Sequence, residues 1–408
     1  MTQPSKLRQL LQIPVIVAAL GYFVDIYDLL LFSIVRIPSL RYLGVPEDKL
    51  LDEGLYLINM QMAGMLVGGI LWGVLGDKKG RLSVLFGSIL LYSLANIANG
   101  LVTTVGQYAV WRFIAGVGLA GELGAGITLV AEILPKEIRG YGTSLVASVG
   151  VLGAVLAYFI ADWFDWQIAY FIGGGLGISL LLMRVSVFES GIFKNVKEQA
   201  VARGNFFQLF SSGRQFFKYL QCILIGLPIW FVIGFLVSLS PEFGQALGIA
   251  TPIIAGKAIM CAYIGLSLGD MASGLLSQFI QSRKKVVLTF ISLTSLFMAL
   301  YLFMPLPSAN DLYLLCGGLG FSIGYWALFV TIAAEQFGTN LRATVATTVP
   351  NFVRGSINVI TPLFLYFKTQ YGIIGSASLV GVITITIALL ALWKLDETFG
   401  KDLNFLEE

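Results

Sequence analysis

Two carboxylates stand in the middle of an apolar stretch near the start of the chain, GYFVDIYDLLLF at residues 21–32. Asp25 and Asp28 are three positions apart, so in a helix they lie on roughly the same face. Because a carboxylate is costly in hydrocarbon, each must face a polar cavity or a partner. Two neighbouring carboxylates in low dielectric oppose one another's ionisation. One of them can therefore bind and release a proton near neutral pH.

A second group of charges lies on one further apolar segment. Arg112 and Glu122 are ten residues apart in the sequence, which is about 15 Å along a helix. This spacing puts Glu122 at the depth of Asp25, and Arg112 nearer the outer face with Asp28. We predict Asp25, Asp28 and Glu122 as proton-coupling residues, with Asp25 favoured because it lies deeper. Two alternatives stay open: a fixed Asp28–Arg112 ion pair, and a protonated Glu122 hydrogen-bonded between glycine-rich helices.

Arg354 is the most informative charge in the second half, within VPNFVRGSINV. It lies near the centre of an apolar run, and Asn351 and Asn358 flank it at helical spacing. A guanidinium facing a cavity there suits a carboxylate or phosphate, which it can bind bidentately. The alternative is an ion pair with an acid of a neighbouring helix, such as Asp270. The predicted substrate-binding residues are Arg354, Tyr27, Arg112, Asn351 and Asn358.

The composition indicates an integral membrane protein. Of 408 residues, 57% are hydrophobic and 12% charged, and the mean hydropathy is +0.84; soluble domains carry about twice that charged fraction. The net charge of +3 is not gathered in one patch, which argues against nucleic-acid binding. There is no histidine, so proton coupling would have to use carboxylates. Cys222, Cys261 and Cys316 lack metal-ligand spacing, and no nucleophile–base pair appears, so we expect no cofactor, no metal and no enzyme.

The apolar runs predict twelve spans of about 20 residues each. Their ranges are 11–35, 54–76, 82–102, 106–134, 141–162, 166–186, 217–240, 252–280, 286–305, 311–334, 343–367 and 373–394. Basic residues concentrate in alternate short loops, which predicts that both termini are cytoplasmic. The residues that set this orientation are Lys6, Arg8, Lys78, Lys79, Arg81, Lys136, Arg139, Arg283, Lys284, Lys285 and Arg342.

The two halves of the chain look alike. AEILPKEIRG at 131–140 matches AEQFGTNLRA at 334–343, an offset of 334 − 131 = 203. GVLGDKKGRLSVLF from Gly73 resembles GLLSQFIQSRKKVVLTF from Gly274, at 274 − 73 = 201. Such a duplicated six-helix unit is the arrangement that transporters use to alternate access around a midplane site. We predict an N-terminal bundle at 1–187, a cytoplasmic linker at 188–215, and a C-terminal bundle with a cytoplasmic tail at 216–408.

Four strings carry a family resemblance. GVLGDKKGR, after the second predicted span, resembles the loop signature of the major facilitator superfamily. GYFVDIYD, RFIAGVGLAGELGAG and PKEIRG resemble strings of its metabolite:proton symporters; the first is also similar to phosphate:proton symporters, and the last to sugar porters. The resemblance implies an all-α membrane protein of twelve transmembrane helices in two pseudo-symmetric six-helix bundles. It also implies a substrate class of small carboxylates, betaine or proline.

The resemblance and the repeat together suggest gating residues at the inner ends of the helices. In the second half the signature aspartate is replaced by Gln278, and its glycine and arginine by Gln281 and Ser282. We therefore expect asymmetric gate contacts. The predicted gating residues are Asp77, Gly80, Arg81, Glu132, Arg139, Asp270, Glu335 and Arg342.

The sequence thus predicts a secondary active transporter of the cytoplasmic membrane. We expect proton-coupled symport of a small organic anion or zwitterion by a functional monomer, whose partners are substrate, protons and lipid. The first alternative is an uncoupled facilitator or an organic-phosphate antiporter of the same fold. The second is a transporter-like receptor, which the absence of an added sensory domain disfavours.

Overall fold

The computed structural model describes residues 11–79, 81–122, 130, 134, 136–189 and 206–400, and within these ranges the regular structure is entirely helical. The N-terminal set of helices precedes residue 190, and the C-terminal set follows residue 205. The N-terminal set comprises α2 (Ile13–Tyr42), η1 (Glu47–Lys49), α3 (Leu50–Lys79), α4 (Arg81–Asn99), α5 (Val105–Leu119), α7 (Lys136–Val151), α8 (Gly153–Trp163) and α9 (Trp166–Glu189).

The C-terminal set contains more and shorter pieces. It comprises η3 (Phe206–Phe210), α10 (Gly213–Leu224), α11 (Leu227–Phe231), η4 (Val232–Val237), α12 (Ser240–Ala246), α13 (Ala255–Ile280), α14 (Arg283–Phe303), α15 (Ala309–Ser322), α16 (Trp326–Glu335), α17 (Thr339–Gly355) and α18 (Ile357–Lys394). The predicted single span at 217–240 is therefore divided among α10, α11, η4 and the start of α12. Pro228 near the start of α11 and the π-helical turn η4 account for this division.

The helices are long and apolar enough to cross a bilayer. Nine helical stretches of the described residues meet that criterion, and Val84–Asn99 is a shorter apolar helix. The stretch Thr344–Lys394 holds two predicted spans, because α18 reverses at Gly372, whose positive φ of 67° suits glycine. The fourth predicted span, 106–134, runs into residues outside the described ranges. The all-helical, multi-span architecture confirms the predicted fold class.

Several spans are broken at equivalent places in the two repeats. α5 ends at Leu119 and α15 ends at Ser322, an offset of 322 − 119 = 203. α7 gives way to α8 at Leu152, and α17 gives way to α18 at Ser356, an offset of 356 − 152 = 204. These offsets match the sequence repeat, although the spans were predicted as continuous. Broken helices near the bilayer midplane are where transporters place their substrate sites.

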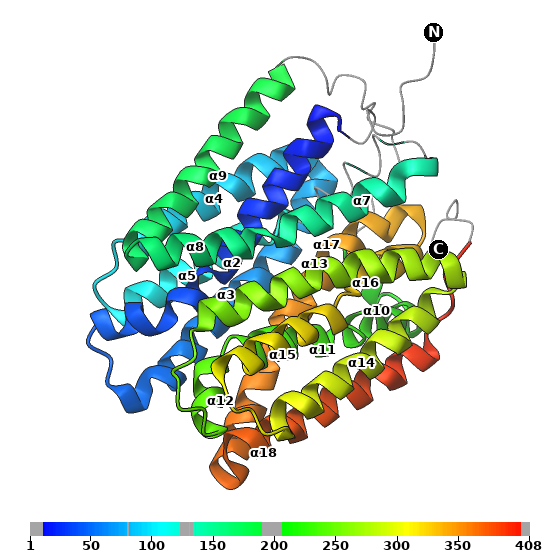
Figure 1. Ribbon diagram of the computed structural model, residues 1–408. Helices are drawn as coiled ribbons and strands as arrows, with labels where there is room; N and C mark the ends of the chain where they lie inside the picture. Colours follow the sequence, from blue (N-terminus) through cyan, green and yellow to red (C-terminus); the bar gives the residue numbers. More distant parts are fainter. Residues whose placement is uncertain are drawn as a thin grey trace.

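The two sets of helices pack against each other along their length. α13 contacts α2, α7 and α8, and α3 contacts α17 and α18. Figure 1 shows the long helices running side by side, with the start of α2 and the end of α18 toward the same, upper right end of the molecule. That end carries the basic loops, and we call it the inner end because the sequence predicts it to be cytoplasmic.

The first helix is longer than the sequence predicts, and this changes the place of one arginine. The apolar run suggested an end at residue 35, whereas α2 continues to Tyr42. Arg36 therefore lies inside the helix and is fully buried. Its Nη2 donates to Oε1 of Glu242 on α12 at 2.6 Å, across the two sets. At the outer end of the molecule, an ion pair thus joins α2 and α12.

Candidate substrate and proton site

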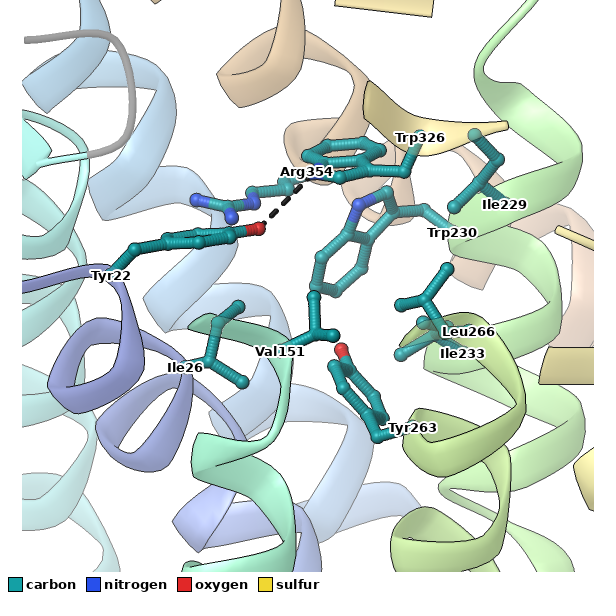
Figure 2. Close-up of a pocket in the computed structure, with 10 residues that line it drawn as sticks. All are labelled: Tyr22, Ile26, Val151, Ile229, Trp230, Ile233, Tyr263, Leu266, Trp326 and Arg354. Carbon is teal, nitrogen blue, oxygen red and sulfur yellow. Dashed lines mark hydrogen bonds between the residues drawn. The ribbon is translucent and has the colours of Figure 1, made fainter. Parts of the chain in front are cut away.

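A small cavity lies between the two sets, at the level of the helix breaks. Its volume is about 10 Å³, which holds about one water molecule. Its lining combines one arginine, four aromatic side chains and five aliphatic side chains, and Figure 2 shows how they surround it. These residues are Arg354, Tyr22, Trp230, Tyr263, Trp326, Ile26, Val151, Ile229, Ile233 and Leu266.

Arg354 is the one charged residue of this lining. It is 1% exposed, and its guanidinium carbon lies 5.7 Å from the ring centroid of Trp230 and 5.5 Å from that of Trp326. Trp326 Nε1 in turn donates to the Tyr22 hydroxyl at 3.1 Å, joining the two sets across the cavity. Nε and Nη1 of Arg354 have no hydrogen-bond partner, and no ion pair to Asp270 forms. A buried guanidinium with free donors strongly favours an anion beside it.

The two repeats contribute different residues to the cavity lining at equivalent positions. Val151 on α7 and Arg354 on α17 both line it, and their separation is 354 − 151 = 203 residues, the offset of the repeat. The duplicated helices therefore present equivalent positions to the same space, one aliphatic and one cationic. An anion in this cavity would be bound by Arg354, which belongs to the C-terminal set.

Asp25 and Asp28 are both fully buried on α2, and neither lines the cavity. None of their four carboxylate oxygens has a hydrogen-bond partner. Asp25 lies within electrostatic range of Arg354 from the C-terminal set and of Glu122 and Arg184 from the N-terminal set. It is thus placed between the cavity cation and a buried ion pair.

Glu122 forms that ion pair, which the sequence did not reveal. Both carboxylate oxygens accept from Arg184 on α9: Nη1 donates to Oε2 at 3.1 Å, and Nη2 donates to Oε1. Glu122 is 1% exposed and Arg184 6%. A methyl group at Gly21 on α2 would overlap both side chains. The N-terminal set therefore contains a bidentate buried pair beside Asp25, and glycine on α2 leaves room for it.

Arg112 does not pair with Asp28 in this structure, so the fixed ion pair weighed from the sequence is not formed. Its Nη2 donates to Oε1 of Gln61, and its guanidinium carbon lies 4.4 Å from the ring centroid of Phe32. Nε and Nη1 lack partners, and Arg112 is 1% exposed. Asp25, Asn96 and Arg112 are the neighbouring groups that act electrostatically on Asp28.

The other predicted substrate residues are not part of the cavity lining. The Tyr27 hydroxyl donates to the Ala169 carbonyl at 2.8 Å. Asn351 Nδ2 donates to the carbonyl of Ala120 in the N-terminal set at 2.8 Å, and to its own helix. Asn358 Nδ2 donates to the preceding turn. Tyr27 thus braces α2 against α9, and Asn351 joins the two sets.

Two of the predicted gating acids have defined partners. Asp270 Oδ1 accepts from the Ala327 amide at 3.0 Å and so caps the start of α16. Glu335 pairs with Arg283 at 2.6 Å, and Arg342, another predicted gating residue, donates to the carbonyls of Ala334 and Phe337. Gly80 and Glu132 lie outside the described residues, and so do the side chains of Asp77, Arg81 and Arg139.

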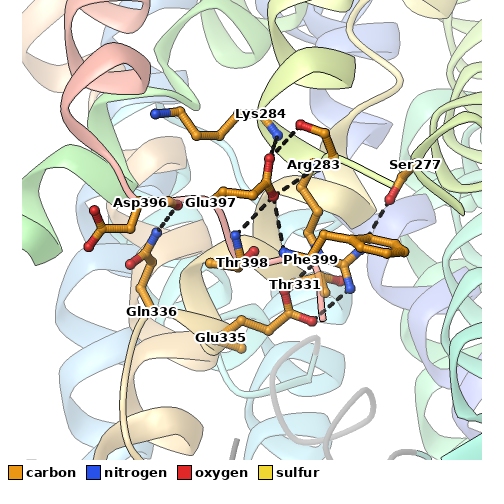
Figure 3. A network of polar contacts seen from close by, with 12 residues as sticks. Ser277, Arg283, Lys284, Thr331, Glu335, Gln336, Asp396, Glu397, Thr398 and Phe399 are labelled. Atoms are coloured by element: carbon orange, nitrogen blue, oxygen red, sulfur yellow. Dashed lines mark hydrogen bonds and ion pairs between the residues drawn. The ribbon is translucent and has the colours of Figure 1, made fainter. Parts of the chain in front are cut away.

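The Arg283–Glu335 pair belongs to a network that holds the chain's last described residues (Figure 3). The Glu397 carboxylate accepts from the Ser282 hydroxyl at 2.5 Å and from the amides of Arg283 and Lys284 at the start of α14. Burial raises the pKa of Glu397, but these hydrogen bonds outweigh it and hold the pKa below its usual range. The network ties α13, α14, α16 and the segment after α18 together at the inner end.

Comparison with known proteins agrees with this architecture. Residues 19–362 match the Major Facilitator Superfamily. A putative niacin/nicotinamide transporter of Bacillus subtilis (strain 168) is 26% identical over 363 residues, covering 86% of each chain. The sialic acid transporter NanX of Escherichia coli (strain K12) is 24% identical, covering 87% of each. The niacin transporter NiaP of Acinetobacter baylyi is 34% identical over 142 residues, which are 32% of its length.

A solved structure shares the fold. The proton:xylose symporter XylE, bound to 6-bromo-6-deoxy-D-glucose, superposes with a TM-score of 0.70 at 16% identity, covering 96% of this chain and 97% of that one. The match in fold and the match to the superfamily extend over the helices that form the cavity. This chain therefore belongs to the major facilitator superfamily and is a multi-pass membrane transporter, not an enzyme.

Proposed function

We propose that the protein is a proton-coupled symporter that carries a small organic anion across the cytoplasmic membrane. The observation that carries this proposal is the buried guanidinium of Arg354, which lines the cavity and has two donor atoms without a hydrogen-bond partner. Asp25, whose carboxylate also lacks a hydrogen-bond partner, lies within electrostatic range of this guanidinium. The anion binds Arg354, and the proton binds Asp25. The bundles at 1–187 and 216–408, joined by the linker at 188–215, rock about this site, with both termini in the cytoplasm and a functional monomer.

The lining supports a flat substrate with an aromatic ring. Trp230 and Trp326 flank Arg354, and Tyr22 and Tyr263 complete an aromatic wall. Stacking on such rings favours planar ligands, and the guanidinium favours a carboxylate. Relatives named for niacin and benzoate transport agree with this class. The cavity of about 10 Å³ must widen to admit such a molecule.

Coupling follows from competition for Arg354. In the empty, closed protein the ionised Asp25 compensates the buried cation. A substrate carboxylate that binds Arg354 displaces this interaction, and Asp25 is then left as a buried anion beside a second anion. Taking up a proton removes that charge. Each substrate anion therefore enters the closed state together with one proton.

Closure of the outer end is assigned to Arg36 and Glu242. Their ion pair spans the two sets, and Thr361 donates to Asn59 across the same interface at 3.0 Å. Arg36 also approaches the Leu50 carbonyl. Opening toward the outside must separate α12 from α2, so this pair must break in each cycle.

The test uses proteoliposomes that contain the protein and a pH-sensitive dye. Nicotinate, benzoate, nicotinamide, betaine, glycerol phosphate and xylose are added one at a time. Proton entry with nicotinate or benzoate, and none with the neutral nicotinamide, supports an anion site with proton coupling. Asp25→Asn should then abolish uphill accumulation and spare exchange of internal for external substrate. Uphill uptake retained by Asp25→Asn would refute the role of Asp25. Radiolabelled substrate crossing without a proton signal would indicate the facilitator or antiporter alternative.

A further inference from the structure

A stripe of polar side chains on α4 lies buried in the N-terminal set, apart from the cavity. Its members are Tyr92, Ser93, Asn96 and Asn99, all 0% exposed. Their spacing places them along one face of the helix, over about 10 Å of its length. Six of their side-chain atoms have no hydrogen-bond partner: the hydroxyls of Tyr92 and Ser93 and both amide atoms of Asn96 and Asn99.

This stripe connects the carboxylates to the outer end of the molecule. Tyr92 is within electrostatic range of Asp25, Asp28 and Glu122 together. Asn96 approaches the Asp28 carboxylate at the limit of hydrogen-bonding geometry. Asn99 ends α4, two residues before Leu101, which is 66% exposed. The polar side chains therefore lie along α4 from the level of the buried acids toward the outer face.

The glycine-rich stretch of α9, GGGLG at 173–177, faces the same stripe. A methyl group at Gly173 would overlap the Asp28 carboxylate, and one at Gly177 would overlap the Ser93 hydroxyl. Gly175, in the same stretch, has nothing within 4 Å of such a methyl. Two of the four glycines of this stretch, Gly173 and Gly177, thus leave room for the polar side chains of α2 and α4, in addition to allowing close helix packing.

We propose that this stripe, lined by α4, the glycines of α9 and Asp28, is a hydrated path that delivers protons from the outer face to Asp28 and Asp25. Buried polar groups nearly always have a partner, and buried water supplies it where two to four polar atoms converge. A proton from outer water passes along these hydrogen bonds to a carboxylate oxygen of Asp28, and from there to Asp25. The charged groups around the path are Asp25, Asp28, Glu122, Arg112 and Arg184.

The path is separate from the route of the substrate. Of its members, none lines the cavity between the two sets. Protons can therefore reach Asp25 when the cavity is occupied by substrate. This inference rests on the proposed proton coupling, and the experiments below separate its failure from the failure of that proposal.

Hydration is tested directly by radiolytic footprinting of the protein in nanodiscs, which oxidises side chains beside bound water. Tyr92 is compared with Tyr301, which is equally buried but whose hydroxyl donates to the Leu236 carbonyl at 2.8 Å. We expect Tyr92 to be modified about tenfold faster than Tyr301, because only Tyr92 lies among unpartnered polar atoms. Equal protection of the two tyrosines would overturn the proposal.

Proton delivery is tested with Asn96→Leu and Gly177→Ala, and Gly175→Ala is the matched control. The two path variants should slow substrate-driven proton entry by about a hundredfold, while exchange of substrate at equal pH continues. Gly175→Ala should behave as wild type. Coupled uptake at the wild-type rate in both path variants would overturn the path and leave the proposed symport intact. A wild-type protein that moves substrate without protons would overturn both, even where Tyr92 is hydrated.

Discussion

The Glu122–Arg184 pair allows a decisive test of which acid carries the proton. Both side chains are buried and joined by two hydrogen bonds, so Glu122→Gln leaves a buried guanidinium without its counter-ion. Removing one partner of such a pair costs about 3–5 kcal/mol of unfolding free energy. Arg184→Gln should cost a similar amount. The double variant should recover most of this loss, because no unpaired charge remains and two amides can hydrogen-bond to each other.

The same variants separate a structural role of Glu122 from a role in coupling. Arg184 also acts on Asp25, so Glu122→Gln frees a cation that holds Asp25 ionised, and proton-driven uptake should fall. In the double variant that cation is gone, and uptake should return. If Glu122 is itself the proton carrier, the double variant stays uncoupled.

Unfolding is followed by the reaction of a thiol dye with Cys222 and Cys316, which are fully buried, during titration with a denaturing detergent. Gly21→Ala provides a steric check, because its methyl overlaps the pair; it should destabilise the protein without removing a charge. Two results would refute the reasoning: a Glu122→Gln protein within about 1 kcal/mol of wild type, or a folded double variant that exchanges substrate but never accumulates it.

Three further predictions concern the cavity and the two ends of the molecule. Arg354→Gln should raise the KM for an anionic substrate by about 10- to 100-fold, the range for a lost charge-assisted hydrogen bond, and uptake of a neutral analogue should change little. Glu242→Gln should weaken the Arg36 pair and increase labelling of cysteines introduced in the cavity by an impermeant outside reagent; unchanged labelling would contradict its gating role. The carboxylate of Glu397 has a lowered pKa in the folded state, so its stabilisation is complete above its unfolded pKa of about 4.3. It is lost as the pH falls through the lower folded value, and hydrogen exchange of the last described residues should show this, with Glu397→Gln removing the pH dependence.

The sequence singled out the charged residues that stand out against an apolar background, and their functional roles remain predictions. Asp25, Asp28 and Arg354 are charges near the middle of apolar runs, and burial there demands a polar environment. The repeat was visible as matching strings, and it correctly implied equivalent helices. Glu122 was also noticed, but not its partner. Arg184 lies two residues before the end of the predicted span 166–186, where a snorkelling arginine is ordinary.

The spacing of residues in the sequence could not predict contacts between distant segments. Arg36 and Glu242 are 206 positions apart, and the predicted end of the first helix placed Arg36 in a loop. An arginine just beyond an apolar run gives no sign of whether the helix continues. The aromatic wall was equally hidden, because Trp230 and Trp326 resemble packing residues until the broken helices α11 and α16 bring them to Arg354. Breaks of this kind depend on tertiary packing more than on local propensity.

The division of charge between the repeats explains how one cavity can enforce coupling. The cation Arg354 belongs to the C-terminal set, and the acid Asp25 belongs to the N-terminal set. Closing the two sets around a space of about 10 Å³ removes most water, so net charge in the closed site is strongly disfavoured. The empty site is balanced when Asp25 is ionised, and the loaded site is balanced when a substrate anion is present and Asp25 is protonated. A proton alone leaves Arg354 uncompensated, and an anion alone leaves two negative charges against one positive. Closing the site with only the proton or only the anion bound is therefore energetically unfavourable. On the proposed mechanism, substrate and proton must cross together.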